Sequence, residues 1–241
     1  SILVAPLGAA GASMAADEVL RFGVAAEPYA PFSVKDASGK WQGWEIDLMD
    51  AVCAEMKAKC EIVDIAWDGI IPALLEKKFD VIWSSMSITD KRKEVMDFSQ
   101  PYLENTWNLV SMSSRNLQLS DLSELKQYSI GYPRGMAYSD FIRNELEPKG
   151  IYQLDKVKLY PSYNEVLADL QNGNLDLAFL DGTVASVYRK KLPISDSWGW
   201  SGFDRFGYAF PKGSPLREDF DRYLAELGPE KLQAIIDKWL D

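Results

Sequence analysis

Residues 84–92, with the sequence SSMSITDKR, contain the side chains best suited to hold a small acid. Three hydroxyls lie within four positions, on Ser84, Ser85 and Ser87, and Arg92 follows them. Arginine presents a planar pair of donors that fits a carboxylate, and serine hydroxyls supply further donors. The spacing therefore predicts a carboxylate site. The alternative is a capped loop that leads into a solvated run of charge, DKRKE.

Asp181 ends the segment LDLAFLD, whose apolar run is typical of a buried strand. Open α/β sheets bind ligands at the carboxyl ends of their strands, so this carboxylate could accept hydrogen bonds from an ammonium group. A structural role is equally consistent with the local sequence, because Asp181 could cap a helix over residues 182–190.

Aromatic side chains follow the first predicted strand and precede a predicted helix. The segment EPYAPF places Glu27 and Tyr29 close to Phe32, and Trp67 comes just before the helix. Aromatic faces can enclose an apolar side chain or attract a cation. Burial in the core is the usual alternative for any single aromatic residue.

Residues 134–137, RGMA, form a predicted strand-to-helix turn. The first backbone N–H groups of a helix favour an anion, so this turn is a second candidate for contact with a carboxylate. It is not a phosphate-binding loop, because the patterns GxxxxGK[ST] and GxGxxG are both absent.

The composition of the 241-residue chain excludes several classes of function. It has 26 basic and 36 acidic side chains, a formal charge of −10, and no histidine. Without histidine there is no Ser-His-Asp or Cys-His nucleophile system and no histidine-based metal site. The acidic balance gives no basic surface for nucleic acid. We expect no cofactor. The length of the chain fits one large domain or two small ones.

The first 16 residues, SILVAPLGAAGASMAA, are uncharged and either apolar or small. They are too short to span a bilayer as a helix and are typical of the end of a secretory signal peptide, although an added tail would look similar. In an exported protein the two cysteines, Cys53 and Cys60, most simply form one disulfide. Two buried free thiols are the alternative.

Strand and helix patterns alternate along both halves of the chain and must position these side chains. Strands over residues 19–24, 60–65 and 79–85 alternate with helices over 46–56 and 68–78. This order predicts an α/β fold with a mainly parallel sheet. The second half repeats it: at an offset of 96, Trp67 aligns with Tyr163, and Ser84-Ser85 with Leu180-Asp181. Two explanations of this match remain open. The unit is duplicated within the chain, or the match reflects the pattern that any helix–turn–strand unit shares.

Four segments, in this order, resemble the polar amino-acid-binding proteins of bacterial ABC importers, the family 3 solute-binding proteins. They are EPYAPF, GWEIDLMDAVCAEM, AWDGIIPALLEKKFDVIWSSMSITDKRKEVMDFSQPY and LDLAFLD. The resemblance spans residues 18–241 and implies a two-lobed periplasmic binding fold, a Venus flytrap with two hinge crossings near residues 104–111 and 201–208. It implies a signal-peptide remnant over 1–16, lobe 1 over 17–109 and 204–241, and lobe 2 over 110–203. The Cys53–Cys60 spacing also matches a disulfide of some members.

The resemblance implies a carboxylate-binding half of the site. Arg92 would bind the α-carboxylate of the ligand, helped by Ser87 and by the backbone near Met136 and Ala137. Relatives often have Ser or Thr where this chain has Met136 and Ala137, so a hydroxyl contact is missing here.

It also implies a half that binds the rest of the ligand. Asp181 would bind the α-ammonium together with Ser85. Tyr29 and Trp67 would sandwich the ligand side chain, with Glu27 near its distal end. Two further residues would line the same pocket: Ser84 and Met86.

The expected function is that of a periplasmic receptor, secreted through a cleaved signal peptide. As a monomer it would capture an amino acid, with a polar or cationic side chain favoured, or a close derivative, and deliver it to a membrane ABC permease. The main alternative is an enzyme resembling cyclohexadienyl dehydratases on the same fold, with Glu27 or Asp181 as general acid. A sensory ligand-binding domain is a third possibility.

Overall fold

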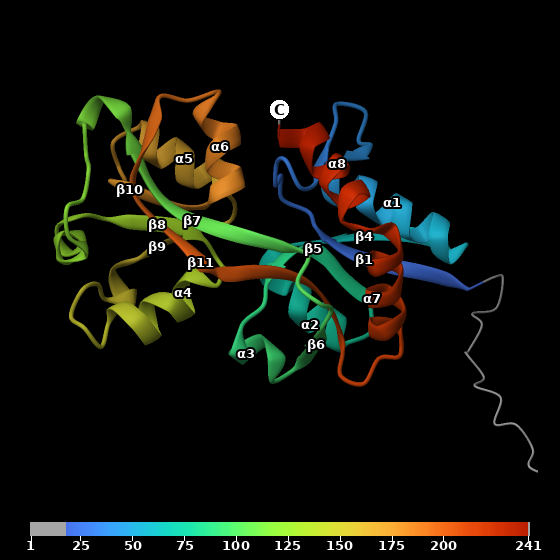
Figure 1. Cartoon of the computed structure of the whole chain (residues 1–241). Helices are drawn as coiled ribbons and strands as arrows, with labels where there is room; N and C mark the ends of the chain where they lie inside the picture. The colour runs from blue at the N-terminus through green and yellow to red at the C-terminus, as the bar shows by residue number, and fades with distance from the viewer. Residues whose placement is uncertain (1–17, 241) are drawn as a thin grey trace, which may run out of the picture.

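The computed structural model describes residues 18–240, so the predicted signal-peptide remnant over residues 1–16 lies outside the described residues. The described chain forms two α/β lobes joined by two long strands, β7 (Leu103–Met112) and β11 (Ile194–Pro211) (Figure 1). These strands pair with each other and cross from one lobe to the other. The two-lobed fold with two hinge crossings is therefore confirmed.

Lobe 1 is built around a sheet whose strands lie in the order β4, β1, β5, β11. The first three strands run parallel: β4 (Lys59–Ile65), β1 (Val19–Ala25) and β5 (Val81–Ser87). The C-terminal part of β11 pairs with β5 and with β6 (Met96–Phe98) in the antiparallel direction. A small hairpin, β2 (Val34–Lys35) and β3 (Trp41–Gln42), precedes the first helix. The helices of this lobe are α1 (Trp44–Met56), α2 (Ile70–Leu75), α3 (Asp90–Lys93), α7 (Leu216–Leu227) and α8 (Pro229–Leu240).

Lobe 2 continues the sheet beyond β7 with β10 (Leu177–Asp181), β8 (Ile130–Pro133) and β9 (Lys158–Tyr160). These strands run parallel to one another and antiparallel to β7. Its helices are α4 (Tyr138–Phe141), which continues as a π turn over Ile142–Leu146, α5 (Tyr163–Gln171) and α6 (Gly182–Arg189). Single-turn or short 3-10 segments connect them: Ser113–Arg115, Leu122–Gln127 and Leu154–Lys156.

The sheet is mixed rather than mainly parallel, which corrects the prediction. Strands within each half are parallel, as the alternation of strands and helices requires. The two crossing strands run in opposite directions, because the chain leaves lobe 1 through β7 and returns through β11. Each therefore pairs antiparallel with its neighbours in the sheet.

The predicted helix over residues 68–78 is shorter in the structure. A 3-10 turn, Trp67–Gly69, leads into α2, which ends at Leu75. Lys77 adopts a left-handed backbone conformation, with φ of 60°, and this conformation closes the turn after the helix. Trp67 is the first residue of this turn and precedes α2, in keeping with its predicted place before the helix.

Aromatic rings and one disulfide hold lobe 1 together. The rings of Phe22 and Phe220 pack edge-on and tilted against Trp83, at centroid distances of 5.3 and 5.7 Å, and all three side chains are fully buried. Cys53 of α1 and Cys60 of β4 form a disulfide, with their Cα atoms 6.4 Å apart. The predicted disulfide is confirmed, and the alternative of two free thiols is excluded.

Candidate functional site

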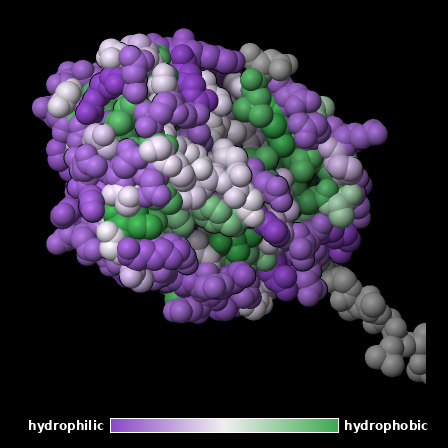
Figure 2. Space-filling view, turned by 60° about the vertical axis from the view of Figure 1, so that its left-hand side comes forward, coloured by the Kyte–Doolittle hydropathy of each residue, from purple (hydrophilic) through white to green (hydrophobic). Residues whose placement is uncertain are grey.

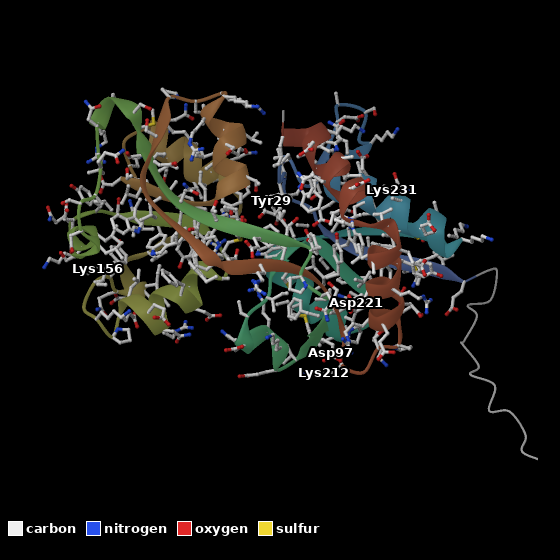
Figure 3. The ribbon with its side chains drawn as sticks, in the orientation of Figure 1. Tyr29, Asp97, Lys156, Lys212, Asp221 and Lys231 are labelled. Atoms are coloured by element: carbon white, nitrogen blue, oxygen red, sulfur yellow. A yellow bond between two sulfur atoms is a disulfide. The ribbon has the colours of Figure 1, made fainter. Side chains whose placement is uncertain are left out.

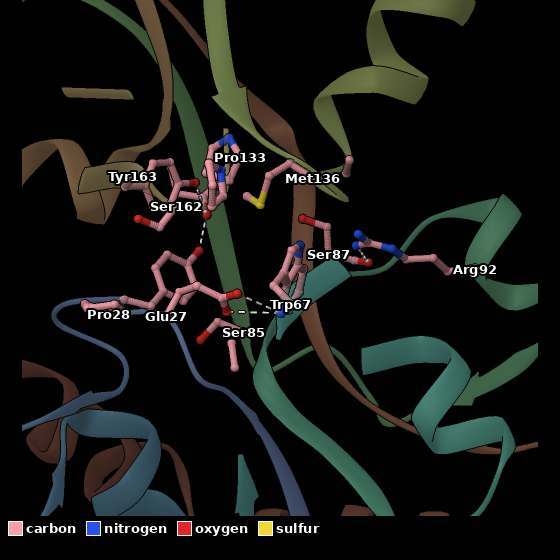
Figure 4. A pocket seen from close by; sticks show the side chains of 15 residues that line it. Glu27, Pro28, Trp67, Ser85, Ser87, Arg92, Pro133, Met136, Ser162 and Tyr163 are labelled. Carbon is pink, nitrogen blue, oxygen red and sulfur yellow. Dashed lines mark hydrogen bonds between the residues drawn. The ribbon is translucent and has the colours of Figure 1, made fainter. Parts of the chain in front are cut away.

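A cavity lies between the two lobes and is called the interlobe cavity below (Figure 4). It lies where the carboxyl ends of β5 and β10 meet, as expected for open α/β sheets. The structure brings these residues singled out from the sequence into its lining: Glu27, Tyr29, Trp67, Ser85, Ser87, Arg92, Met136, Ala137 and Asp181.

Ser84 and Met86 do not line the interlobe cavity, in contrast with the expectation for them. Side chains alternate between the two faces of a strand, and β5 turns Ser85 and Ser87 toward the cavity. The Ser84 hydroxyl instead accepts a hydrogen bond from the Ala25 N–H at 3.1 Å. Met86 is fully buried in a separate apolar cluster beside α2.

Arg92 is held at the cavity by its own helix and by two backbone carbonyls. It lies in α3, whose cap Thr89 accepts a hydrogen bond from the Arg92 N–H at 3.2 Å. The guanidinium donates to the Ser87 carbonyl at 2.8 Å and to the Gly135 carbonyl, in lobe 2, at 2.9 Å. It also lies 5.7 Å from the centre of the Trp67 ring, within range of a cation–π contact. Arg92 therefore presents a positive charge in a fixed position.

Burial opposes the positive charge of Arg92 but does not remove it. Only 8% of this residue is exposed, and burial lowers the pKa of its guanidinium from the usual value. The carboxylates of Asp204, Asp140 and Asp181 oppose the decrease. An arginine keeps its proton under these conditions, so the group remains a cation.

Asp181 is the last residue of β10 and is 1% exposed. Its Oδ1 accepts hydrogen bonds from the Asn105 amide and from the Tyr138 hydroxyl, both at 2.8 Å. Its Oδ2 accepts from the Tyr29 hydroxyl, which reaches across from lobe 1. Asp181 occupies the N-cap position of α6, as the alternative reading expected, but its side chain makes no capping hydrogen bond there.

A second buried carboxylate lies behind Asp181. Asp204 of β11 is 6% exposed and accepts hydrogen bonds from the Asn105 amide at 2.6 Å and from the Trp107 indole N–H at 2.8 Å. The amide of Asn105 thus donates to both acids. Burial, with the charge of Asp204 second, raises the pKa of Asp181 to about 6.

Glu27 and the two predicted aromatic residues lie on the lobe 1 side of the cavity. The Trp67 backbone N–H, at the start of the 3-10 turn, donates to both oxygens of Glu27 at 3.0 and 3.2 Å. Tyr29 lies between the lobes (Figure 3) and stacks on Tyr163 of lobe 2, with ring centres 5.8 Å apart. Phe32, in contrast, is fully buried in the core.

Some cavity residues were not singled out from the sequence as ligand contacts. They are Ala25, Pro28, Pro133, Pro161, Ser162 and Tyr163. The internal match at an offset of 96 contained the signal for one of them, because it aligns Tyr163 with Trp67, and both line the cavity. It also aligns Ser85 with Asp181, a second such pair.

Within residues 18–240, no group of three or more Cys, Asp and Glu side chains could hold a metal ion. Over the same residues, the structure contains no helix with the length and apolar character to cross a membrane. Hydrophilic residues cover most of the face in Figure 2, and hydrophobic residues show in separate patches between them.

The model of one protein family, the bacterial extracellular solute-binding proteins, family 3, matches residues 20–241. The chain belongs to this family. The match includes both lobes and every residue that lines the interlobe cavity. It agrees with the resemblance seen in the sequence alone.

Relatives of this family 3 protein are named for the amino acids they bind. It is 37% identical to an L-arginine-binding protein of Pseudomonas aeruginosa over 70% of the chain and 63% of that relative. It is 33% identical to the lysine/arginine/ornithine-binding periplasmic protein of Escherichia coli, over 94% of the chain and 89% of the relative. Among solved structures, an ancestral arginine-binding protein bound to arginine matches with a TM-score of 0.83 and 30% identity, over 92% and 98% of the two chains.

Proposed function

We propose that this protein is an extracytoplasmic solute-binding protein that captures a basic α-amino acid between its lobes and delivers it to an ABC permease. The charges of the interlobe cavity support this proposal best. Its lining has one cationic side chain, Arg92, and two carboxylates, Asp181 and Glu27. A ligand with one carboxylate and two cationic groups complements that set, and a basic amino acid is such a ligand.

The zwitterionic end of the ligand lies between the lobes in this proposal. Arg92 binds the α-carboxylate, with the Ser87 hydroxyl and the backbone at Met136 and Ala137 as further donors. The Asp181 carboxylate binds the α-ammonium. The ammonium replaces the Tyr29 hydroxyl as a hydrogen-bond donor to this carboxylate and is the stronger donor of the two. Charge-assisted hydrogen bonds of both kinds are stronger than neutral ones.

The ligand side chain lies against aromatic rings and ends near Glu27. Tyr29 and Trp67 line the cavity on the same side as this carboxylate. An arginine or lysine side chain would place its alkyl part against the rings and its charge near Glu27. The names of the relatives, which include arginine, lysine and ornithine, agree with this assignment.

Closure of the two lobes makes binding selective. The ligand gains contacts from both lobes only when they meet, and only this difference in affinity can drive closure. We propose that lobe 1 comprises residues 17–109 and 204–241, that lobe 2 comprises residues 110–203, and that β7 and β11 bend at these boundaries.

The location and partners follow from the same proposal. We infer a periplasmic monomer that docks transiently on its membrane permease and that loses a signal peptide ending within residues 1–16. We infer binding without chemical conversion, in contrast with the dehydratase alternative, which requires a proton donor placed at a leaving group.

Isothermal titration calorimetry tests the proposal. The protein is unfolded and refolded to remove co-purified solutes and is then titrated with each of the twenty common amino acids, with ornithine and with an opine. We expect the tightest binding for arginine, lysine or ornithine. If no amino acid releases heat, the amino-acid assignment is wrong, and turnover of a prephenate-like acid would support the dehydratase instead.

A further inference from the structure

A carboxyl group buried behind the interlobe cavity contacts the cavity wall through one serine. Glu45 lies in the first turn of α1 and is 0% exposed. Its Oε1 accepts a hydrogen bond from the Ser85 hydroxyl at 2.6 Å and another from the Tyr102 hydroxyl. Its Oε2 accepts from the Tyr208 hydroxyl at 2.8 Å. Among the residues the structure describes, Glu45 does not line the cavity, but Ser85 does.

The direction of these hydrogen bonds follows from the three hydroxyl groups that converge on the Glu45 carboxyl oxygens. Burial raises the pKa of both Tyr102 and Tyr208 well above the usual value, and the nearby Glu45 charge adds to the rise, so both phenols keep their protons. The pKa of Glu45 is raised, because burial outweighs the lowering effect of its three hydroxyl donors. Three donors converge on two oxygens, as a carboxylate requires. The Ser85 proton is therefore directed toward Glu45, away from the cavity.

The backbone at Ser85 is shaped for this contact. Ser85 has a φ of 50°, which non-glycine residues rarely adopt. The pairing of β5 with β11 shifts here: Met86 faces Gly207 and Ile82 faces Ala209, so β5 holds extra residues opposite Tyr208. A bulge of this kind re-aims a side chain, and the surrounding contacts must hold its unusual backbone. Glu45 bonds to Ser85 on the bulged strand and to Tyr208 on the strand that faces it.

The rest of the cluster packs closely and links β11 with the segment that leads into β7. Tyr208 lies in β11, and Tyr102 immediately precedes β7. The Tyr208 ring stacks between those of Trp83 and Tyr102, at centroid distances of 3.3 and 4.2 Å. The Trp83 indole also donates to the Glu45 carbonyl at 2.8 Å. The carboxylate that orients Ser85 is thus itself held in place.

We propose that Glu45 is a positioning residue that makes the Ser85 hydroxyl a hydrogen-bond acceptor for the α-ammonium of the ligand. With its proton donated to Glu45, the Ser85 oxygen offers only lone pairs to the cavity. It therefore suits a cation and does not suit the ligand carboxylate. Asp181 and Ser85 then contact the ammonium from opposite lobes. The inference rests on the proposed function, because it assumes a ligand with an α-ammonium.

The test compares two ligands that differ only in the α-amino group. L-Arginine and its des-amino analogue, 5-guanidinopentanoate, are titrated by calorimetry into the wild-type protein and into Glu45→Gln. Glutamine keeps the size of the side chain, but its amide N–H groups are themselves hydrogen-bond donors. One of the three hydroxyls that donate to Glu45 must therefore rotate away. We expect Glu45→Gln to weaken arginine binding about tenfold and to change binding of the analogue less than twofold. An equal loss for both ligands would show a purely structural role and overturn the inference.

Two further variants separate this route from a general effect. In a Ser85→Ala background, Glu45→Gln should cause no additional loss for arginine, since the two residues act through one contact. Tyr208→Phe removes a donor from the same cluster but leaves the Ser85 contact, so discrimination between the two ligands should stay within twofold of wild type. A selective loss of arginine binding in Tyr208→Phe, or an additive loss in the double variant, would contradict the proposal.

Glu45→Asp provides the same comparison if Glu45→Gln does not fold. It keeps the charge but withdraws the carboxylate by one methylene, so the selective loss for arginine should appear again, and its absence in a folded Glu45→Asp protein would overturn the inference. A wild-type protein that binds neither ligand would instead refute the basic-amino-acid assignment itself, and the role of Glu45 with it. The two failures are therefore distinct.

Discussion

The ends of β5 and β10 are matching places in the two lobes, yet they present opposite chemistry to the interlobe cavity. β5 ends on the hydroxyls of Ser85 and Ser87, with the cation Arg92 following it, whereas β10 ends on the anion Asp181. Arg92 donates to two carbonyl oxygens, and three hydroxyls surround Asp181 together with the Asn105 amide. The same strand-to-helix geometry therefore supports either sign of charge, depending on what its neighbours donate or accept.

In the proposed function, this difference suits a dipolar ligand between the lobes. Each half of the cavity would then bind one charge of the ligand, and neither half alone would bind both. Changes on the two sides should therefore weaken binding through different parts of the ligand.

Replacing Arg92 should have the largest effect. Arg92→Ala removes the only cation among the described cavity residues, and truncating one member of a buried charge pair costs on the order of 3 kcal/mol or more. We expect calorimetry to show an affinity for L-arginine at least ~100-fold lower. Arg222→Ala, on the exposed surface of α7, is the matched control and should bind as wild type. Affinity within threefold of wild type in Arg92→Ala would refute the assigned orientation.

Replacing Asp181 should have the next largest effect, and on the other end of the ligand. Asp181→Asn keeps the shape of the side chain but removes its charge, so we expect affinity for L-arginine to fall roughly 30-fold. Binding of 5-guanidinopentanoate, which has no α-ammonium, should change much less. Equal losses for both ligands would mean that Asp181 supports the fold of lobe 2 rather than the ammonium.

Acidification should weaken binding through lobe 2. The pKa of Asp181 is raised to about 6 by burial, then by Asp204. In the proposed orientation its ionised form binds the ammonium. The groups that face it are Asp204, Asn105, Tyr29, Tyr138, Tyr163 and Arg92. Below pH 6 affinity should fall by about tenfold per unit, as measured by calorimetry between pH 5 and 7.5.

The stability of the ligand-free protein should show the opposite dependence on pH. A folded pKa of about 6 lies above the ordinary aspartate value of 3.8, so this group stabilises the fold fully below pH 3.8 and loses that contribution as the pH rises through 6. The chain has no histidine to mask this titration.

The variant Asp181→Asn is the control for the pH dependence of binding. In this variant the fall in affinity between pH 7.5 and 5 should disappear, and its persistence would assign the titration to another group.

Removing the disulfide should have the smallest effect on binding and act on lobe 1 alone. Cys53 and Cys60 are seven residues apart in the sequence and do not line the cavity. A loop this short contributes about 2 kcal/mol to stability, so the double variant Cys53→Ser/Cys60→Ser should melt roughly 5 °C lower. Affinity for L-arginine should stay within twofold. A larger loss of affinity would mean that the packing of α1 controls the site.

The sequence predicted the parts of the site in which polar residues interrupt apolar strands. Ser85, Ser87 and Asp181 follow buried runs, and such positions meet at one edge of a sheet. Asn105 and Asp204 were not identified, because polar residues in an alternating strand also occur on a solvated face. Their burial depends on how β7 and β11 pair across the two lobes. Glu45 was not identified either, because an acid in the first turn of a helix is already explained by its favourable interaction with the helix dipole.

The C-terminal helices have a consequence for the order in which the molecule is completed. Lobe 1 joins both ends of the described chain: Phe22 meets Phe220 with ring centres 5.9 Å apart, and Asp47 accepts from Lys238 at 2.9 Å. Lobe 2 is built from one uninterrupted stretch between the crossing strands. A chain emerging from its N-terminus can therefore finish lobe 2 first, while the core of lobe 1 waits for α7 and α8. A chain cut before α7 would contain every residue of the interlobe cavity and still lack the packing that holds half of them in place.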